Sequence, residues 1–154
     1  MLYFAYRSNM HWDQMRSRCP SARFVGVALL RDFRLAFTRN SIRRNSGVAG
    51  TVTERGGCVW GVVYEVDDDD LRTLDECEGY RGGGEQNRYV RRTSEVLPGG
   101  GERRRRAAVV YFANRQANPP LPSSEYKNLL VSGARYWELP PEYIRELEEV
   151  ETSG

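Results

Sequence analysis

Apolar residues along this chain recur mostly in short runs, a pattern more typical of strands than of long helices. The run at 2–6 predicts a buried strand, and further runs predict strands at 23–30, 32–38, 48–53, 58–66, 88–96 and 104–112. Glycine-rich segments at 54–57 and 98–101 indicate hairpin turns, and the polar segment at 40–46 indicates a flexible loop. Consecutive hairpins favour an antiparallel or mixed sheet that curls into a barrel.

Helical patterns are short and lie between or after these strands. We expect helices from Ser8 or Asn9 to about Arg18, at 71–78, from 124 to about 135, and from 140–141 to about 150. Ser, Asn and Asp at helix starts can accept hydrogen bonds from free backbone N–H groups, and proline is tolerated in a first turn. The expected fold is α+β, in one domain over 1–154: a small mixed, mostly antiparallel β-barrel of about six or seven strands with three or four short peripheral helices.

Composition narrows the class of protein. With 40% hydrophobic and 29% charged residues in 154, the chain has the make-up of a globular domain. No apolar run approaches the roughly 20 residues of a membrane span, and no charged leader precedes an apolar segment, so we expect no membrane association and a cytoplasmic location. The three cysteines are too few and too scattered for a disulfide framework or a zinc site, which fits a reducing compartment.

Charge and histidine content exclude further classes. The single histidine, His11, would have to carry a histidine-based metal centre or catalytic triad alone, so we expect neither. Net charge is only +2, although Lys127 is the one lysine among 23 basic residues, and we attribute this arginine excess to genome composition. A general nucleic-acid binder carries a larger positive charge, so we expect no nucleic-acid partner and interpret the arginine-rich segment 101–106 as a solvated hairpin face.

One carboxylate stands on an unexpected face of its helix. Leu71, Leu74 and Glu78 occur at i, i+3 and i+7 of the segment "DDDDLRTLDECEG", so they share one stripe. Because the leucines must face the core, Glu78 is carried inward with them. Burial and the negative end of the helix both disfavour its ionised form, which suits a general base that later acts as a general acid. The alternative is that the helix frays and Glu78 turns to solvent or pairs with an arginine.

Several segments together resemble the γ-glutamylcyclotransferase (AIG2-like) family. The opening "YFAYRSNM" looks like that family's "YFAYGSN" loop, and "LDECEG" looks like its "LDxxEG" helix end. Three further segments of this chain are similar to the next segment, the central strand and the late tyrosine helix of that family. In chain order they are "RCPSARFVGVALLRDFRLAF", "VWGVVYEV" and "PSSEYKNLLVSGA". The order and spacing agree over most of the chain.

The resemblance implies an enzyme that releases 5-oxoproline and a free amine or amino acid from a small-molecule γ-glutamyl substrate, without a metal or cofactor. It implies that Glu78 is the catalytic base and acid, and that the opening strand and turn cradle the γ-glutamyl head. The substrate-binding residues expected from it are Tyr3, Phe4, Ala5, Tyr6, Arg7, Ser8, Asn9, Tyr89, Tyr111 and Tyr126. The loop at 82–88 is expected to form the outer wall of the pocket, and either a monomer or a homodimer is compatible with the sequence.

Arg7 departs from the family pattern, which has glycine at this position. Glycine would let the backbone approach a substrate closely and adopt positive φ at little cost. Three outcomes are open for the arginine: it turns to solvent and activity is retained, it binds a substrate carboxylate and shifts specificity, or it approaches Glu78 and weakens the base. The last outcome would leave a catalytically impaired small-molecule-binding protein of the same fold, or a very slow enzyme.

Overall fold

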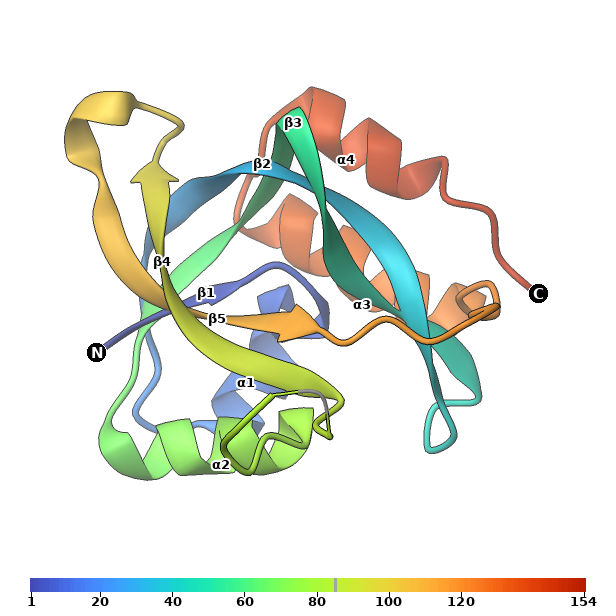
Figure 1. The fold of residues 1–154 in the computed structure, drawn as a ribbon. Helices are drawn as coiled ribbons and strands as arrows, with labels where there is room; N and C mark the ends of the chain where they lie inside the picture. The colour runs from blue at the N-terminus through green and yellow to red at the C-terminus, as the bar shows by residue number, and fades with distance from the viewer. Residues whose placement is uncertain (85) are drawn as a thin grey trace.

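Five strands close into a barrel in the order β1-β3-β2-β4-β5 (Figure 1). A computed structural model describes residues 1–84 and 86–154. The strands are β1 (Leu2–Ala5), β2 (Arg23–Ser41), β3 (Ser46–Glu65), β4 (Tyr89–Pro98) and β5 (Arg106–Ala113). Neighbouring strands are antiparallel, except that β1 and β5 pair in parallel at Tyr3 and Val109 and so close the barrel. The expected mixed, mostly antiparallel barrel is confirmed.

The expected count of six or seven strands is wrong, because β2 and β3 are each one long strand of 19 and 20 residues. Their pairing is irregular at three points, and one of these lies between Arg31 and Phe33. There Asp32 has a φ of 69°, and its carboxylate accepts a hydrogen bond from the N–H of Gly56 at 3.0 Å. The residues at 54–57 therefore form a bulge within β3 and not a hairpin turn. The polar segment at 40–46 extends both strands and turns only at 42–45.

Within residues 1–84 and 86–154, four α-helices lie outside the barrel, and all four were expected from the sequence. They are α1 (Trp12–Arg18), α2 (Asp68–Glu78), α3 (Ser124–Tyr136) and α4 (Pro141–Glu148). The first begins later than expected, because Ser8–Met10 forms a separate 3-10 turn. Figure 1 shows α2 across the bottom of the view and α3 beside α4 on another flank. Among the described residues, no helix has the length and apolar character needed to cross a bilayer.

The ends of α2 explain how this helix presents Glu78. At its start, the Asp67 carboxylate accepts a hydrogen bond from a backbone N–H of the first turn at 2.8 Å. At its end, Gly79 adopts a φ of 70°, the left-handed conformation that closes many helices. Leu71 and Leu74 are buried, and Glu78 on the same face is only 5% exposed. The inward position predicted for Glu78 is confirmed.

Two groups of buried side chains form the core. All five strands contribute to one group, which fills the barrel and contains Phe4. The other group packs the outside of the barrel against the helices and contains Tyr3 and Ala5. Alternate residues of β1 therefore face opposite sides, as the pleat of a strand requires.

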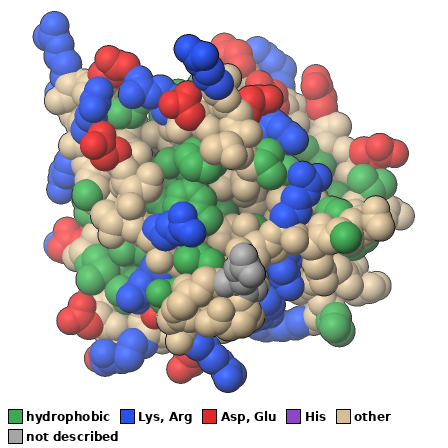
Figure 2. Space-filling model, viewed as in Figure 1, with side chains coloured by type: hydrophobic (Ala, Val, Ile, Leu, Met, Phe, Trp, Pro, Cys, Tyr) green, Lys and Arg blue, Asp and Glu red, His purple; other side chains and the backbone are tan. Residues whose placement is uncertain are grey.

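The surface carries charges of both signs. Figure 2 shows basic and acidic side chains interspersed on the face seen in Figure 1. The segment 101–106 is exposed throughout. Glu102 there pairs with Arg31, and Arg105 lies 3.5 Å from a carboxylate oxygen of Glu95. The segment is therefore solvated, as expected from the sequence, and two of its residues also lie close to oppositely charged side chains.

Leu74 is a residue of α2 and is fully buried, on the same face of the helix as Glu78. We expect Leu74→Ala to lower the free energy of unfolding by about 2–5 kcal/mol, because it removes buried methyl groups and leaves a cavity. Glu76→Ala on the exposed face of the same helix is the matched control, with an expected change within about 0.5 kcal/mol. Denaturant unfolding measures both changes, and equal losses in the two variants would contradict this orientation of the helix.

Candidate active site

Glu78 forms an ion pair with Arg7 in the wall of a small cavity. The Nη2 atom of Arg7 donates a hydrogen bond to Oε2 of Glu78 at 2.5 Å. The Arg7 side chain is 11% exposed and the Glu78 side chain is 5% exposed. Burial alone would lower the pKa of Arg7, but the adjacent carboxylate raises it well above its ordinary value. Of the outcomes open for Arg7, the structure shows the approach to Glu78. Glu78 is therefore both buried and paired with an arginine.

Two tyrosine rings hold the Arg7 side chain in this position. Its guanidinium carbon lies 4.0 Å from the ring centroid of Tyr89 and 5.4 Å from that of Tyr6, within the range of cation–π attraction. The Tyr89 hydroxyl donates to the carbonyl of Ala49 at 2.7 Å, and the Tyr6 hydroxyl donates to the carbonyl of Tyr111 at 2.6 Å. The rings are thus tied to the barrel, and the guanidinium packed on them fills the space beside the carboxylate.

The turn after β1 is fixed by buried hydrogen bonds around Asn9. Its side-chain nitrogen donates to the Tyr3 hydroxyl at 3.0 Å, and its side-chain oxygen accepts from Gln14 at 2.9 Å and from Arg18 at 3.1 Å. The Tyr64 hydroxyl donates to the Asn9 carbonyl at 2.9 Å. Asn9 is only 3% exposed, so these hydrogen bonds hold the turn from its buried side.

Helix α3 holds the same turn from the other side through a close approach at Gly133. A Cβ atom at this position would lie 2.5 Å from the carbonyl carbon of Met10, which is closer than real side chains come. Glycine therefore allows the helix to pack directly on the backbone of the 3-10 turn. The position of Arg7 thus depends on α3 as well as on β1.

The cavity beside Glu78, called here the inner cavity, has a volume of about 70 Å³. Of the expected substrate-binding residues, Arg7, Ser8, Tyr89 and Tyr126 line it. Seven other wall residues were not expected: Arg18, Arg39, Asn40, Ser41, Arg44, Val48 and Cys77. Ligand pockets usually measure about 300–1,000 Å³, so the inner cavity by itself is smaller than a usual ligand pocket.

The other expected residues lie behind this wall. Tyr3 and Ala5 pack toward the helices, and Phe4 points into the barrel. Tyr6 supports Arg7 with its ring, and burial raises its pKa to about 12. Tyr111 donates its hydroxyl hydrogen to Asp75 at 2.7 Å, and burial raises its pKa.

The loop expected to form the outer wall contributes one residue to the inner cavity. This residue is Arg88, and Glu85 of the same loop lies outside the described residues. Within the described part of the chain, no three His, Cys, Asp or Glu side chains gather as a metal site requires.

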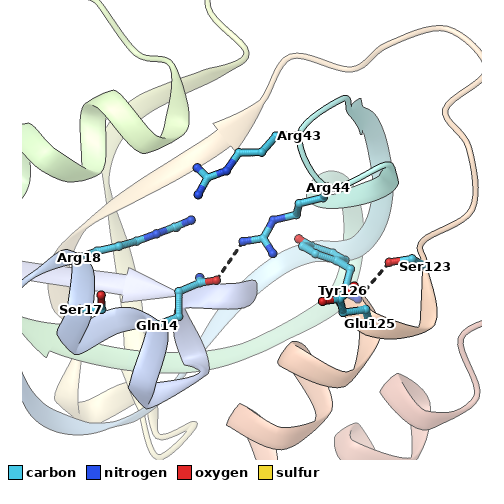
Figure 3. Close-up of a pocket in the computed structure, with 8 residues that line it drawn as sticks. All are labelled: Gln14, Ser17, Arg18, Arg43, Arg44, Ser123, Glu125 and Tyr126. Carbon is cyan, nitrogen blue, oxygen red and sulfur yellow. Dashed lines mark hydrogen bonds between the residues drawn. The ribbon is translucent and has the colours of Figure 1, made fainter.

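A second cavity of about 420 Å³, called here the outer cavity, adjoins the inner one, and the two share Arg18, Arg44 and Tyr126 in their walls. Figure 3 shows Arg18, Arg43 and Arg44 extending into the same space. This group of arginines was not expected from the sequence, because the arginine excess was attributed to genome composition. The available signal was the adjacent pair Arg43-Arg44, but nothing in the sequence places that turn beside the end of α1.

A closed barrel with a buried, ion-paired carboxylate in a cavity wall is an arrangement suited to small-molecule chemistry. The chain matches the family described as gamma-glutamyl cyclotransferase, AIG2-like, over residues 3–128. It is 35% identical to the gamma-glutamylcyclotransferase of Homo sapiens and 34% identical to that of Mus musculus, each over 97% of this chain and 78% of the relative. The protein therefore belongs to the gamma-glutamyl cyclotransferase, AIG2-like family, as its motifs predicted.

Solved structures agree with this assignment. The structure of a gamma-glutamyl cyclotransferase superposes with a TM-score of 0.88, at 32% identity, over 99% of this chain and 89% of that chain. A yeast gamma-glutamyl cyclotransferase specific to glutathione superposes with a TM-score of 0.66, over 97% of this chain and 94% of that one. At 14% identity, the likeness to the yeast protein shows the fold alone.

Proposed function

We propose that this protein is an intramolecular cyclotransferase that releases 5-oxoproline and a free amine or amino acid from γ-glutamyl compounds. The observation that carries the proposal is Glu78, a buried carboxylate in a cavity wall of a chain of this family. The substrate's own amine is the nucleophile in such a reaction, so the site has to supply a proton acceptor and not a nucleophilic side chain.

The proposed reaction moves two protons from the attacking nitrogen to the departing nitrogen through one carboxylate. Glu78 takes a proton from the α-ammonium of the substrate, and the freed amine attacks the γ-carbonyl carbon to close a five-membered ring. Glu78 gives this proton to the departing nitrogen as the original amide bond breaks. It then transfers the second proton of the ring nitrogen, which leaves a neutral lactam and releases the amine as an ammonium ion. Ring closure gains from proximity, because both reacting groups belong to one molecule.

The turn after β1 is the proposed binding site for the oxyanion that forms during ring closure. The first backbone N–H groups of a helical turn have no partner within the turn, and Ser8–Met10 is such a turn next to Glu78. N–H groups held in a fixed direction stabilise developing negative charge without having to reorganise. The hydrogen bonds of Asn9 and the close packing of Gly133 support this role, because they hold the turn rigid.

Arg7 supports a second candidate function, a binding protein that turns over slowly or not at all. Its guanidinium occupies the space beside Glu78 and holds the carboxylate in an ion pair. For catalysis, this pair has to separate so that Glu78 can reach the substrate ammonium. Binding of γ-glutamyl compounds without release of 5-oxoproline would favour the second function.

We place the reaction in the cytoplasm. Cys19, Cys58 and Cys77 are all unpaired, which is the usual state of cysteines in a reducing compartment. Burial raises the pKa of Cys19 to about 12, so its thiol stays protonated and unreactive.

Glutathione is a γ-glutamyl peptide, so it belongs to the class of substrates proposed for this protein.

Release of 5-oxoproline from a set of γ-glutamyl dipeptides and γ-glutamyl amines tests the proposed function. We expect release by the parent protein and a loss of about 100-fold or more in Glu78→Gln, which keeps the shape of the side chain but cannot accept the proton. Substrate binding, measured by calorimetry, should be largely retained. Release by Glu78→Gln at the parental rate would mean that another group is the base.

The matched control is Glu76→Gln, two positions away on the exposed face of α2, which should keep the parental rate. Because Glu78→Gln leaves the buried charge of Arg7 without its partner, the same substitution is also made together with Arg7→Gly. Both forms of the Glu78→Gln protein, with and without Arg7→Gly, should show the same loss of 5-oxoproline release. Circular dichroism checks that each protein is folded.

Arg7→Gly is expected to preserve the rate of 5-oxoproline release or to raise it by up to about tenfold, a factor that corresponds to about 1.4 kcal/mol. The reason is that Glu78 no longer has to leave an ion pair and that the space beside it opens. Steady-state kinetics with one γ-glutamyl dipeptide measures the change. A folded Arg7→Gly protein with a rate more than tenfold lower would instead assign Arg7 to substrate binding.

A further inference from the structure

The outer cavity has no role in the cyclisation step itself, yet it adjoins the site of that step. Its volume of about 420 Å³ lies within the usual range of ligand pockets, whereas the inner cavity is far smaller. Arg18, Arg44 and Tyr126 belong to both walls. A molecule that reacts beside Glu78 and extends past these three side chains therefore enters the outer cavity.

Positive charge gathers in the outer cavity. Arg18 comes from the end of α1, while Arg43 and Arg44 come from the turn between β2 and β3, and Figure 3 shows the three side chains extending into one space. Among the wall residues, Glu125 is the one acidic group. Over the described residues, no carboxylate lies within ion-pair distance of any of the three arginines.

The hydrogen bonds of these arginines go to neutral acceptors. Arg44 donates to Gln14 at 2.9 Å and to Ser8 at 3.4 Å, and Arg18 donates to Asn9 at 3.1 Å. Burial lowers the pKa of Arg44, and the nearby charges of Arg18 and Arg43 lower it further. An anion in this space would replace neutral acceptors by charged ones, which form stronger hydrogen bonds with a guanidinium, and would relieve the repulsion between the cations.

We propose that the outer cavity binds the acceptor half of the γ-glutamyl substrate, and that this half is an amino acid or short peptide with two carboxylates. The inference rests on the proposed function, since it names the substrate class of that same site. Three arginines against one glutamate leave two positive charges in the wall, which two carboxylates balance. An acceptor half without a carboxylate, such as an alkyl amide, would bring no anionic group into the outer cavity.

Three substrates with the same head and different acceptors test the proposal. They are γ-glutamyl-glutamate with two acceptor carboxylates, γ-glutamyl-alanine with one, and γ-glutamyl-ethylamide with none. We expect kcat/KM for 5-oxoproline release to rise from the amide to the diacid by about tenfold or more, mainly through KM, because charge-assisted hydrogen bonds form in binding. The preference should shrink at high salt, since part of the cavity is open to solvent. Equal kcat/KM for the three substrates would overturn the proposal.

Variants in the turn connect the preference to the arginines. The double variant Arg43→Gln/Arg44→Gln should lower the ratio of kcat/KM between γ-glutamyl-glutamate and γ-glutamyl-ethylamide by about tenfold. Arg44→Lys, which keeps the charge, should retain more of the ratio than Arg44→Gln does. The matched control is Arg16→Gln on α1, outside both cavity walls, and it should leave the ratio unchanged. An unchanged ratio in the double variant would overturn the assignment.

Binding measurements separate this proposal from the proposed function. If none of the three compounds yields 5-oxoproline, the cyclotransferase activity fails, and calorimetry with the same three compounds then tests the outer cavity. Tighter binding of γ-glutamyl-glutamate that is lost in Arg43→Gln/Arg44→Gln would support the anion site without the activity. Equal binding of the three compounds, or no binding of any of them, would overturn it.

Discussion

The ion pair between Arg7 and Glu78 is the interaction on which the site depends. A carboxylate that is 5% exposed and a guanidinium that is 11% exposed are both removed from most of their water, and each compensates the other. Taking one partner away from a buried pair typically costs about 3–5 kcal/mol, because the remaining charge is left alone. In the proposed function, the same pairing restricts catalysis, since Glu78 can accept a proton from the substrate only when Arg7 releases it. On that proposal, the ion pair holds the site closed until a substrate separates the two side chains.

Local patterns in the sequence predicted the elements well, because their causes are local. The spacing of Leu71, Leu74 and Glu78 placed the glutamate inside, and Gly79 ends the helix where expected, although the helix begins at Asp68, three residues before its expected start. The number of strands could not be predicted in this way. The segment at 54–57 has the composition of a hairpin turn, and only its pairing opposite Asp32 makes it a bulge within one long strand.

The site was predictable only as far as the family motifs reach. They pointed to Glu78, Ser8, Tyr89 and Tyr126 around one cavity. They did not identify the ion-pair partner of Arg7, because Glu78 lies 71 positions away in the sequence. The direction of the Arg7 side chain depends on its packing against the rings of Tyr89 and Tyr6. The arginines of the outer cavity come from segments that the sequence does not connect. Tyr3 and Phe4 were both expected to bind the substrate head, although side chains alternate along a strand and these two residues face opposite sides.

A double-mutant cycle on stability tests the central claim most directly. Free energies of unfolding are measured for the parent, Arg7→Gln, Glu78→Gln and the variant with both substitutions. If the two groups compensate each other, each single substitution should cost about 3 kcal/mol, and the double variant should lose at least about 1 kcal/mol less than the sum of the two. Strictly additive losses would contradict the pairing of Arg7 with Glu78 and, with it, the account of a site closed by that pair.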